Sequence, residues 1–127
     1  MRKTTIVLLS LVTTLLVTGC GDSEPNWARM TVDHWSAQEA ANYYTITDVQ
    51  ECDARIDGDA RQVHCRLGVR MNANLMDIES ERGSVTESPV VAELAHRFGR
   101  FEAGDERTVA VITRFEKDGR RWRVAAQ

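Results

Sequence analysis

The stretch "CDARIDGDARQVHC", residues 52–65, predicts a β-hairpin closed by a disulfide and is the strongest fold signal in the chain. Its central "DGD", residues 57–59, favours a two-residue turn at positions 58 and 59, which places Cys52 opposite Cys65. Counting outward from the turn makes the two cysteines a non-hydrogen-bonded pair, with Cα atoms about 4.5 Å apart. That separation lies within the range that a disulfide bridges, so we expect a bond between them.

The same register divides the hairpin, expected over residues 44–56 and 60–71, into an apolar and a charged face. The apolar face carries Cys52, Ala54, Ile56, Val63, Cys65, Leu67, Val69 and Met71. The other face carries Glu51, Asp53, Arg55, His64, Arg66 and Arg70. Val49 is out of phase with Tyr44 and Ile46, which predicts a β-bulge near Asp48.

The sequence on either side of this hairpin, together with the hairpin itself, predicts a small α+β domain. "SAQE", residues 36–39, matches a capping box and predicts a short helix over 37–43, whereas "SPVVAELAHRFG", residues 88–99, predicts a second, amphipathic helix. A turn at Asp118-Gly119 predicts a second hairpin over 109–115 and 121–125, in which Phe115 faces Trp122. Residues 72–87 favour no element. We expect an antiparallel sheet of about four strands, in two hairpins, with one or two amphipathic helices packed on one face.

The segment before this domain has the layout of a secretory signal peptide, with Arg2 and Lys3 followed by an apolar stretch over residues 6–17. Val17-Thr18-Gly19-Cys20 resembles the lipobox of bacterial lipoproteins. The resemblance implies cleavage before Cys20, acylation of that cysteine, and a membrane anchor. The alternative is a soluble secreted protein with a chance cysteine at the cleavage site.

These features predict three parts: a lipoprotein signal peptide over 1–19, a lipidated start and linker over 20–33, and one domain over 34–127. Gly21 stands where aspartate would resemble the retention signal of inner-membrane lipoproteins. This favours the outer membrane, with the domain in the periplasm, although Asp22 weakens the argument. With Cys20 acylated, Cys52 and Cys65 form an even pair in an oxidising compartment, which agrees with the predicted disulfide.

Charge and motifs exclude several classes of function. Loss of Arg2 and Lys3 with the signal leaves 14 basic and 19 acidic side chains, a net charge of −5, which argues against a nucleic-acid partner. His34, His64 and His96 show no metal-ligand spacing, and no HExxH, CxxC or nucleophile motif is present. We therefore expect no metal, no cofactor and no enzymatic activity.

A cluster of arginines in the last hairpin is the candidate binding surface. Arg114, Arg121 and Arg123 are expected on its outer face and Arg120 at its turn, where guanidinium groups could bind lipid phosphates or an acidic partner protein. The competing interpretation is a solvated strand face. Trp27 and Trp35 are further candidates, although burial against the helix and sheet is the simpler role for them.

"FEKDGRRWRV", residues 115–124, resembles the last hairpin of small cystatin-like and NTF2-like periplasmic domains. Three functions follow as hypotheses. The first is a non-catalytic, lipid-anchored accessory protein that binds an envelope partner. The second is an inhibitor or immunity protein against an envelope-directed toxin or lysozyme. The third, implied by the resemblance, is a small-ligand-binding domain with a cavity between helix and sheet.

Overall fold

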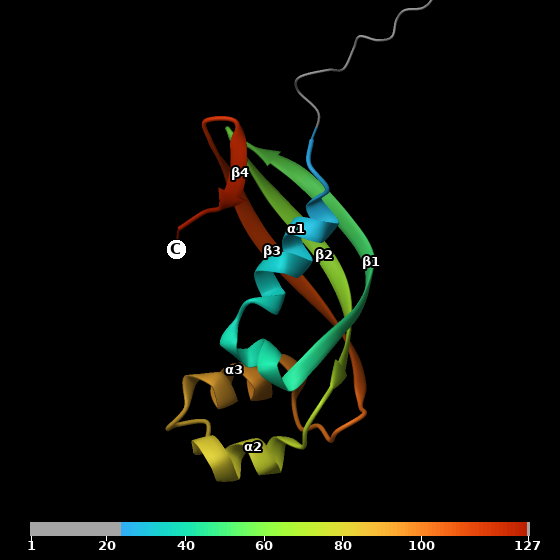
Figure 1. Ribbon diagram of the computed structural model, residues 1–127, viewed down its shortest axis with the longest axis vertical. Helices are drawn as coiled ribbons and strands as arrows, with labels where there is room; N and C mark the ends of the chain where they lie inside the picture. Colours follow the sequence, from blue (N-terminus) through green and yellow to red (C-terminus); the bar gives the residue numbers. More distant parts are fainter. Residues whose placement is uncertain (1–23, 127) are drawn as a thin grey trace, which may run out of the picture.

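A computed structural model describes residues 24–126, which form a curved antiparallel sheet with three α-helices packed against it (Figure 1). The predicted signal peptide and Cys20 lie outside the described residues. The four strands are β1 (Tyr44–Asp57), β2 (Ala60–Met71), β3 (Glu106–Asp118) and β4 (Arg121–Val124). They pair in the order β1-β2-β3-β4, so the predicted α+β class and its two hairpins are confirmed.

The first hairpin has the predicted register throughout its stapled half. Cys52 pairs with Cys65, Asp57 pairs with Ala60, and a disulfide joins the two cysteines across Cα atoms 4.1 Å apart. The predicted bulge is confirmed between Ile46 and Asp48. A second bulge follows between Val49 and Glu51, and the two together return β1 to the phase that the disulfide requires.

The second hairpin corrects the prediction in its register. Asp118 pairs with Arg121, so Gly119 and Arg120 form the turn, and Phe115 faces Val124 instead of Trp122. The pairing is displaced by two residues, an even number, so each side chain keeps its expected face. Gly119 accommodates the turn because its φ is +68°, a region that favours glycine.

Helix α1 (Trp27–Ser36) occupies residues that the sequence analysis assigned to a linker and a capping box. Asn26 is its N-cap and accepts a hydrogen bond from the Arg29 backbone N–H at 3.0 Å, while Ser36 ends the helix instead of starting one. The expected helix over 37–43 is a 3₁₀ helix, η2 (Glu39–Tyr43), whose N-cap makes no side-chain hydrogen bond. The folded domain therefore begins earlier than residue 34.

The remaining helices connect β2 to β3. Helix α3 (Pro89–Phe98) matches the prediction: the Ser88 side chain accepts from the Val91 N–H at 3.3 Å, and Gly99 is the C-cap. Helix α2 (Leu75–Arg82) lies in the segment for which the sequence favoured no element. Its Leu75 and Ile78 side chains are buried in the common core.

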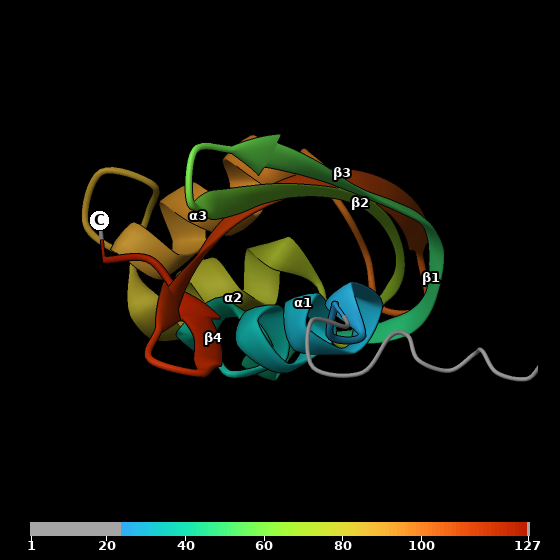
Figure 2. The same cartoon turned by 90° about the horizontal axis from the view of Figure 1, so that it is seen from above.

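One hydrophobic core lies between the sheet and the helices. Figure 2 shows the sheet curving around α1, with β1 and β4 on opposite sides of that helix. Phe115, Leu94 and Val63 are fully buried in this core. Ile56, expected on the apolar face, is 77% exposed, which corrects that part of the prediction. It lies one residue before the end of β1, where Arg55 and Asp57 are exposed as well.

Candidate binding surfaces

The outer face of the sheet, which the helices leave uncovered, holds an open groove of about 680 Å³ across β1, β2 and β3. Residues that pair across the three strands lie side by side in rows along this groove. Asp53, His64 and Ile112 form one row, and Glu51, Arg66 and Ala110 form the next. Alternation along each strand directs these residues away from the core. Three strands therefore contribute to one surface.

Ile112 is a large apolar side chain that is exposed in this groove. It is 57% exposed, whereas Val111 beside it on the same strand is buried on the inner face. Single exposed apolar side chains are common on protein surfaces, and Ile112 points to binding because it lies in a groove built by three strands. Because Val109 and Val111 alternate with it along the strand, Ile112 could have been predicted to point outward, but it was not among the candidate binding residues.

Charged and polar side chains surround Ile112. Asp53 pairs with Arg55 at 2.8 Å, and the His64 ring shares a hydrogen bond of 2.7 Å with Gln62. Glu51 and Arg66 lie directly opposite each other on β1 and β2, on the face that the predicted register assigned to both. Acidic and basic groups balance on this rim, so it suits a partner with apolar contact atoms and both signs of charge rather than a polyanion.

The predicted arginine cluster is divided into different environments. Arg114 pairs with Asp57 and, at 3.8 Å, with Glu116, and Arg123 lies 3.7 Å from Asp118. Among the described residues, Arg120 and Arg121 form no ion pair. Of the four predicted arginines, Arg120 and Arg121 at the β3–β4 turn therefore remain as candidates for binding an anion.

A second pocket, of about 420 Å³, lies beside that turn. It brings Lys117, Arg120, Arg121 and Trp122 from the last hairpin to Met30 of α1 and to Glu24 and Pro25. Trp122 is its aromatic wall, with the Arg61 guanidinium and the Lys117 ammonium 5.1 Å and 5.5 Å from its ring centre. The sequence analysis missed Met30 because α1 and β4 are distant in sequence. Lys117 and Trp122 lie in the same hairpin as the arginines, and the prediction selected the arginines alone.

The two other tryptophans have packing roles. Trp27 contacts Phe115 and Trp122, with ring centres 5.3 Å and 5.2 Å away. The Trp35 indole N–H donates to the Thr113 hydroxyl at 2.9 Å. Both side chains are partly buried against the core, which is the simpler role that the sequence suggested.

The groups with shifted pKa values lie outside the groove. Burial lowers the pKa of His34 and raises that of Tyr44. Hydrogen bonds from the Ser84 backbone and side chain lower the pKa of Glu87, and those of Arg82 with Glu39 and Tyr43 raise its pKa. The three histidines lie on different elements, and the described residues contain no group of three or more metal-ligating side chains.

No helix in the described range 24–126 has the length and apolar character needed to cross a membrane. Comparisons with protein-family models, with curated proteins and with solved structures find no match to this chain.

Proposed function

We propose that the protein is a non-catalytic, lipid-anchored domain of the bacterial cell envelope that binds a partner protein through the groove on its outer sheet face. In this proposal Cys20 carries the lipid in the outer membrane and the domain faces the periplasm. The observation that carries the binding role is the exposed Ile112 in a groove built by three strands.

The groove supports a protein partner because of its shape and its chemistry. Phe98, Leu94 and Phe115 are buried between the helices and the sheet, so the core is filled by side chains where an enclosed ligand site would have to lie. The groove is open and its rim carries both signs of charge. A partner that places an apolar side chain on Ile112 would bury it and meet complementary charges around it.

The cysteines support the location. The Cys52–Cys65 disulfide accounts for two of the three cysteines and fits an oxidising compartment. Cys20 is the third, and it follows the apolar stretch over residues 6–17. Several acyl chains on one cysteine would hold the domain at a membrane, because each buried methylene contributes about 0.8 kcal/mol.

Site-directed photocrosslinking in intact cells tests the binding role. A photoreactive amino acid at Ile112 should capture a reproducible partner, whereas the same amino acid at Glu81, exposed on α2, serves as the matched control. Introducing I112E should remove the product from a photoreactive group placed at Ala110. The proposed groove is wrong if both positions yield the same products or if position 112 yields none.

The anchor has a separate test. Mass spectrometry of the mature protein from cell membranes should show a chain that begins at an acylated Cys20. Cys20→Ser should abolish the lipid modification and remove the lipid-anchored protein from the membrane fraction. An unmodified Cys20 in the mature product contradicts the anchor but leaves the crosslinking result intact.

A further inference from the structure

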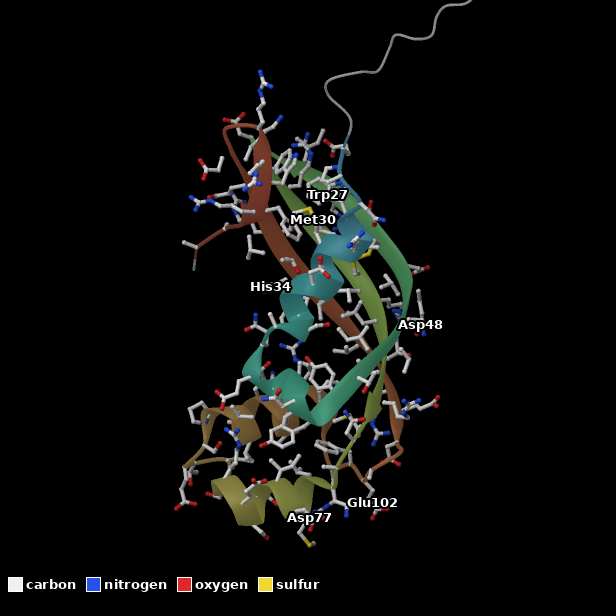
Figure 3. The ribbon with its side chains drawn as sticks, viewed as in Figure 1. Trp27, Met30, His34, Asp48, Asp77 and Glu102 are labelled. Atoms are coloured by element: carbon white, nitrogen blue, oxygen red, sulfur yellow. A yellow bond between two sulfur atoms is a disulfide. The ribbon has the colours of Figure 1, made fainter. Side chains whose placement is uncertain are left out.

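One end of the domain gathers cationic side chains beside the point at which the tether enters. Figure 1 places the β3–β4 turn, the end of β1 and the described start of the chain at the same end. Figure 3 shows Trp27 and Met30 towards this end, and Asp77 and Glu102 at the opposite one. The domain therefore has a tether end and a far end along its longest axis.

The pocket at the tether end combines cations with an apolar wall. Lys117, Arg120 and Arg121 surround it, while Trp122 and Met30 supply apolar surface. A phospholipid headgroup region has the matching chemistry, since phosphate oxygens accept hydrogen bonds from guanidinium groups and tryptophan favours the boundary between water and acyl chains. Ile56, exposed near the end of β1, adds apolar surface at the same end.

The acidic side chains of this end are largely occupied by other arginines. Glu24 pairs with Arg61 at 3.1 Å, and Asp118 pairs with Arg123. Asp57 and Glu116 both pair with Arg114. Within residues 24–126 these pairs leave Lys117, Arg120 and Arg121 without an ion-pair partner, against Asp59 in the β1–β2 turn and the second of the two carboxylates that share Arg114, so the basic side chains exceed the acidic ones by one. The tether end has a positive excess.

The far end has the opposite character. Helix α2 and the segments around it carry Asp77, Glu79, Glu81, Glu87 and Glu102. Arg82 of the same helix is bound to Glu39 and the Tyr43 hydroxyl. An anionic surface would attract the tether end and repel the far end, so the domain would stand with its tether end towards that surface and its far end pointing away.

We propose that the tether end is a membrane-contact face, on which Lys117, Arg120 and Arg121 bind the phosphates of anionic phospholipids in the membrane that holds the anchor. The inference rests on the lipid anchor proposed above. Glu24, which lines the pocket, is four positions after Cys20, so the chain between their Cα atoms spans at most about 14 Å. The anchor would hold the pocket within about one or two Debye lengths of the headgroups.

Reconstituted vesicles provide the test. The mature protein purified from membranes is placed in vesicles of phosphatidylcholine, alone or mixed with phosphatidylglycerol, that also contain a lipid with a nitroxide on its headgroup. Quenching of the fluorescence of the three tryptophans then reports how closely Trp27 and Trp122, at the tether end, approach the headgroups, while Trp35 contributes a signal from the other end of α1. We expect at least twofold stronger quenching with phosphatidylglycerol, and loss of the difference at about 1 M salt, where the Debye length falls to about 3 Å.

Charge reversal at the turn gives the decisive comparison. R120E/R121E should lower the ratio of docked to undocked molecules by about 25-fold or more, since each basic side chain near an anionic surface contributes about fivefold. R70E/R100E makes the same change in net charge at exposed positions outside the pocket and should behave as wild type. Equal quenching in both vesicle types, or equal quenching for both variants, overturns the proposal.

Two further outcomes separate this proposal from its neighbours. If the purified chain has an unmodified Cys20, the lipid-anchor proposal is wrong, and flotation of the same chain with phosphatidylglycerol vesicles tests the membrane contact alone. Flotation that needs Arg120 and Arg121 supports the membrane-contact face, and absence of flotation overturns it. If lipid composition has no effect while R120E/R121E abolishes capture of an acidic protein, the surface belongs to a protein and the lipid proposal is wrong.

Discussion

Removal of the Cys52–Cys65 disulfide should destabilise the domain by about 3 kcal/mol. The bond closes a loop with a sequence separation of 13, and in the chain-entropy model a loop of that length restricts the unfolded chain by about this amount. A domain of this size has a total free energy of unfolding of about 5–15 kcal/mol. The bond therefore accounts for a large share of the stability.

Urea unfolding of the oxidised and reduced protein measures this contribution without a change in sequence. For a urea dependence of about 1–3 kcal/mol per molar, the midpoint should fall by about 1–3 M on reduction. C52A/C65A should unfold near the reduced wild type, displaced slightly further because Cys65 is buried against the Thr31 hydroxyl at 3.6 Å.

The double variant also supplies the control, because its midpoint should not respond to reductant. A wild-type midpoint that is the same before and after reduction would refute the reasoning. The hairpin would then be held by its strand pairing and by the core alone, and the constraint on the unfolded chain would have no measurable effect.

Three other changes test the packing and the titration of the fold. Trp35→Phe should lower the free energy of unfolding by about 1–3 kcal/mol, because the buried Thr113 hydroxyl loses its indole donor. In urea unfolding, adding Thr113→Val to this variant should recover part of the lost stability, and strictly additive losses would contradict the role of the hydrogen bond. Gly68→Ala should cost less than the roughly 1–3 kcal/mol of overpacking in a rigid core, because the added Cβ would meet the carboxylate end of Asp48, an exposed side chain that can turn away. A larger cost that Asp48→Ala does not relieve would show that the backbone has to move. Burial holds the folded-state pKa of His34 below 6.5, so the unfolded chain binds more protons and stability should fall as pH drops below about 6.5. His34→Gln should flatten this part of the pH profile, and an unchanged profile would exclude His34 as its source.

The first hairpin shows what local sequence can establish. A two-residue turn fixes the register of both strands that leave it, so Cys52 opposite Cys65 followed from the position of Gly58. The same logic failed at the second turn, because Asp118-Gly119 and Gly119-Arg120 both place Gly119 in the turn. The two alternatives differ by two residues of register, so the faces were predicted correctly and the partners were not.

Helix α1 was missed because its local signals are weaker than those of its neighbour. The capping-box pattern at Ser36 satisfies a local rule, yet Asn26 caps the helix that forms. A helix of this length is marginal alone and is stabilised mainly by packing. Trp27 and Trp35 supply that packing on the sheet, through contacts with Phe115 and Thr113 near the other end of the sequence.

The groove was not predictable for a related reason. Its rows need β2 beside β3, and α2 and α3 separate these strands in sequence. Alternation alone indicated that His64 points outward, but only the pairing of His64 with Ile112 places an apolar side chain beside it. A surface that spans three strands therefore depends on strand order, which no local turn or cap specifies.

The arginines of the last hairpin show where charge patterning stops being informative. Arg114, Arg120, Arg121 and Arg123 are close in sequence, and the pattern treats them alike. The register sets Asp118 opposite Arg121, yet the Asp118 carboxylate pairs with Arg123. Arg114 pairs with Asp57, whereas Arg120 and Arg121 are exposed beside Lys117. Side chains already bound to carboxylates would have to give up those partners before binding a phosphate. The binding capacity of this hairpin therefore depends on which ion pairs the fold forms, and the two arginines of the turn region are the ones that R120E/R121E should reveal.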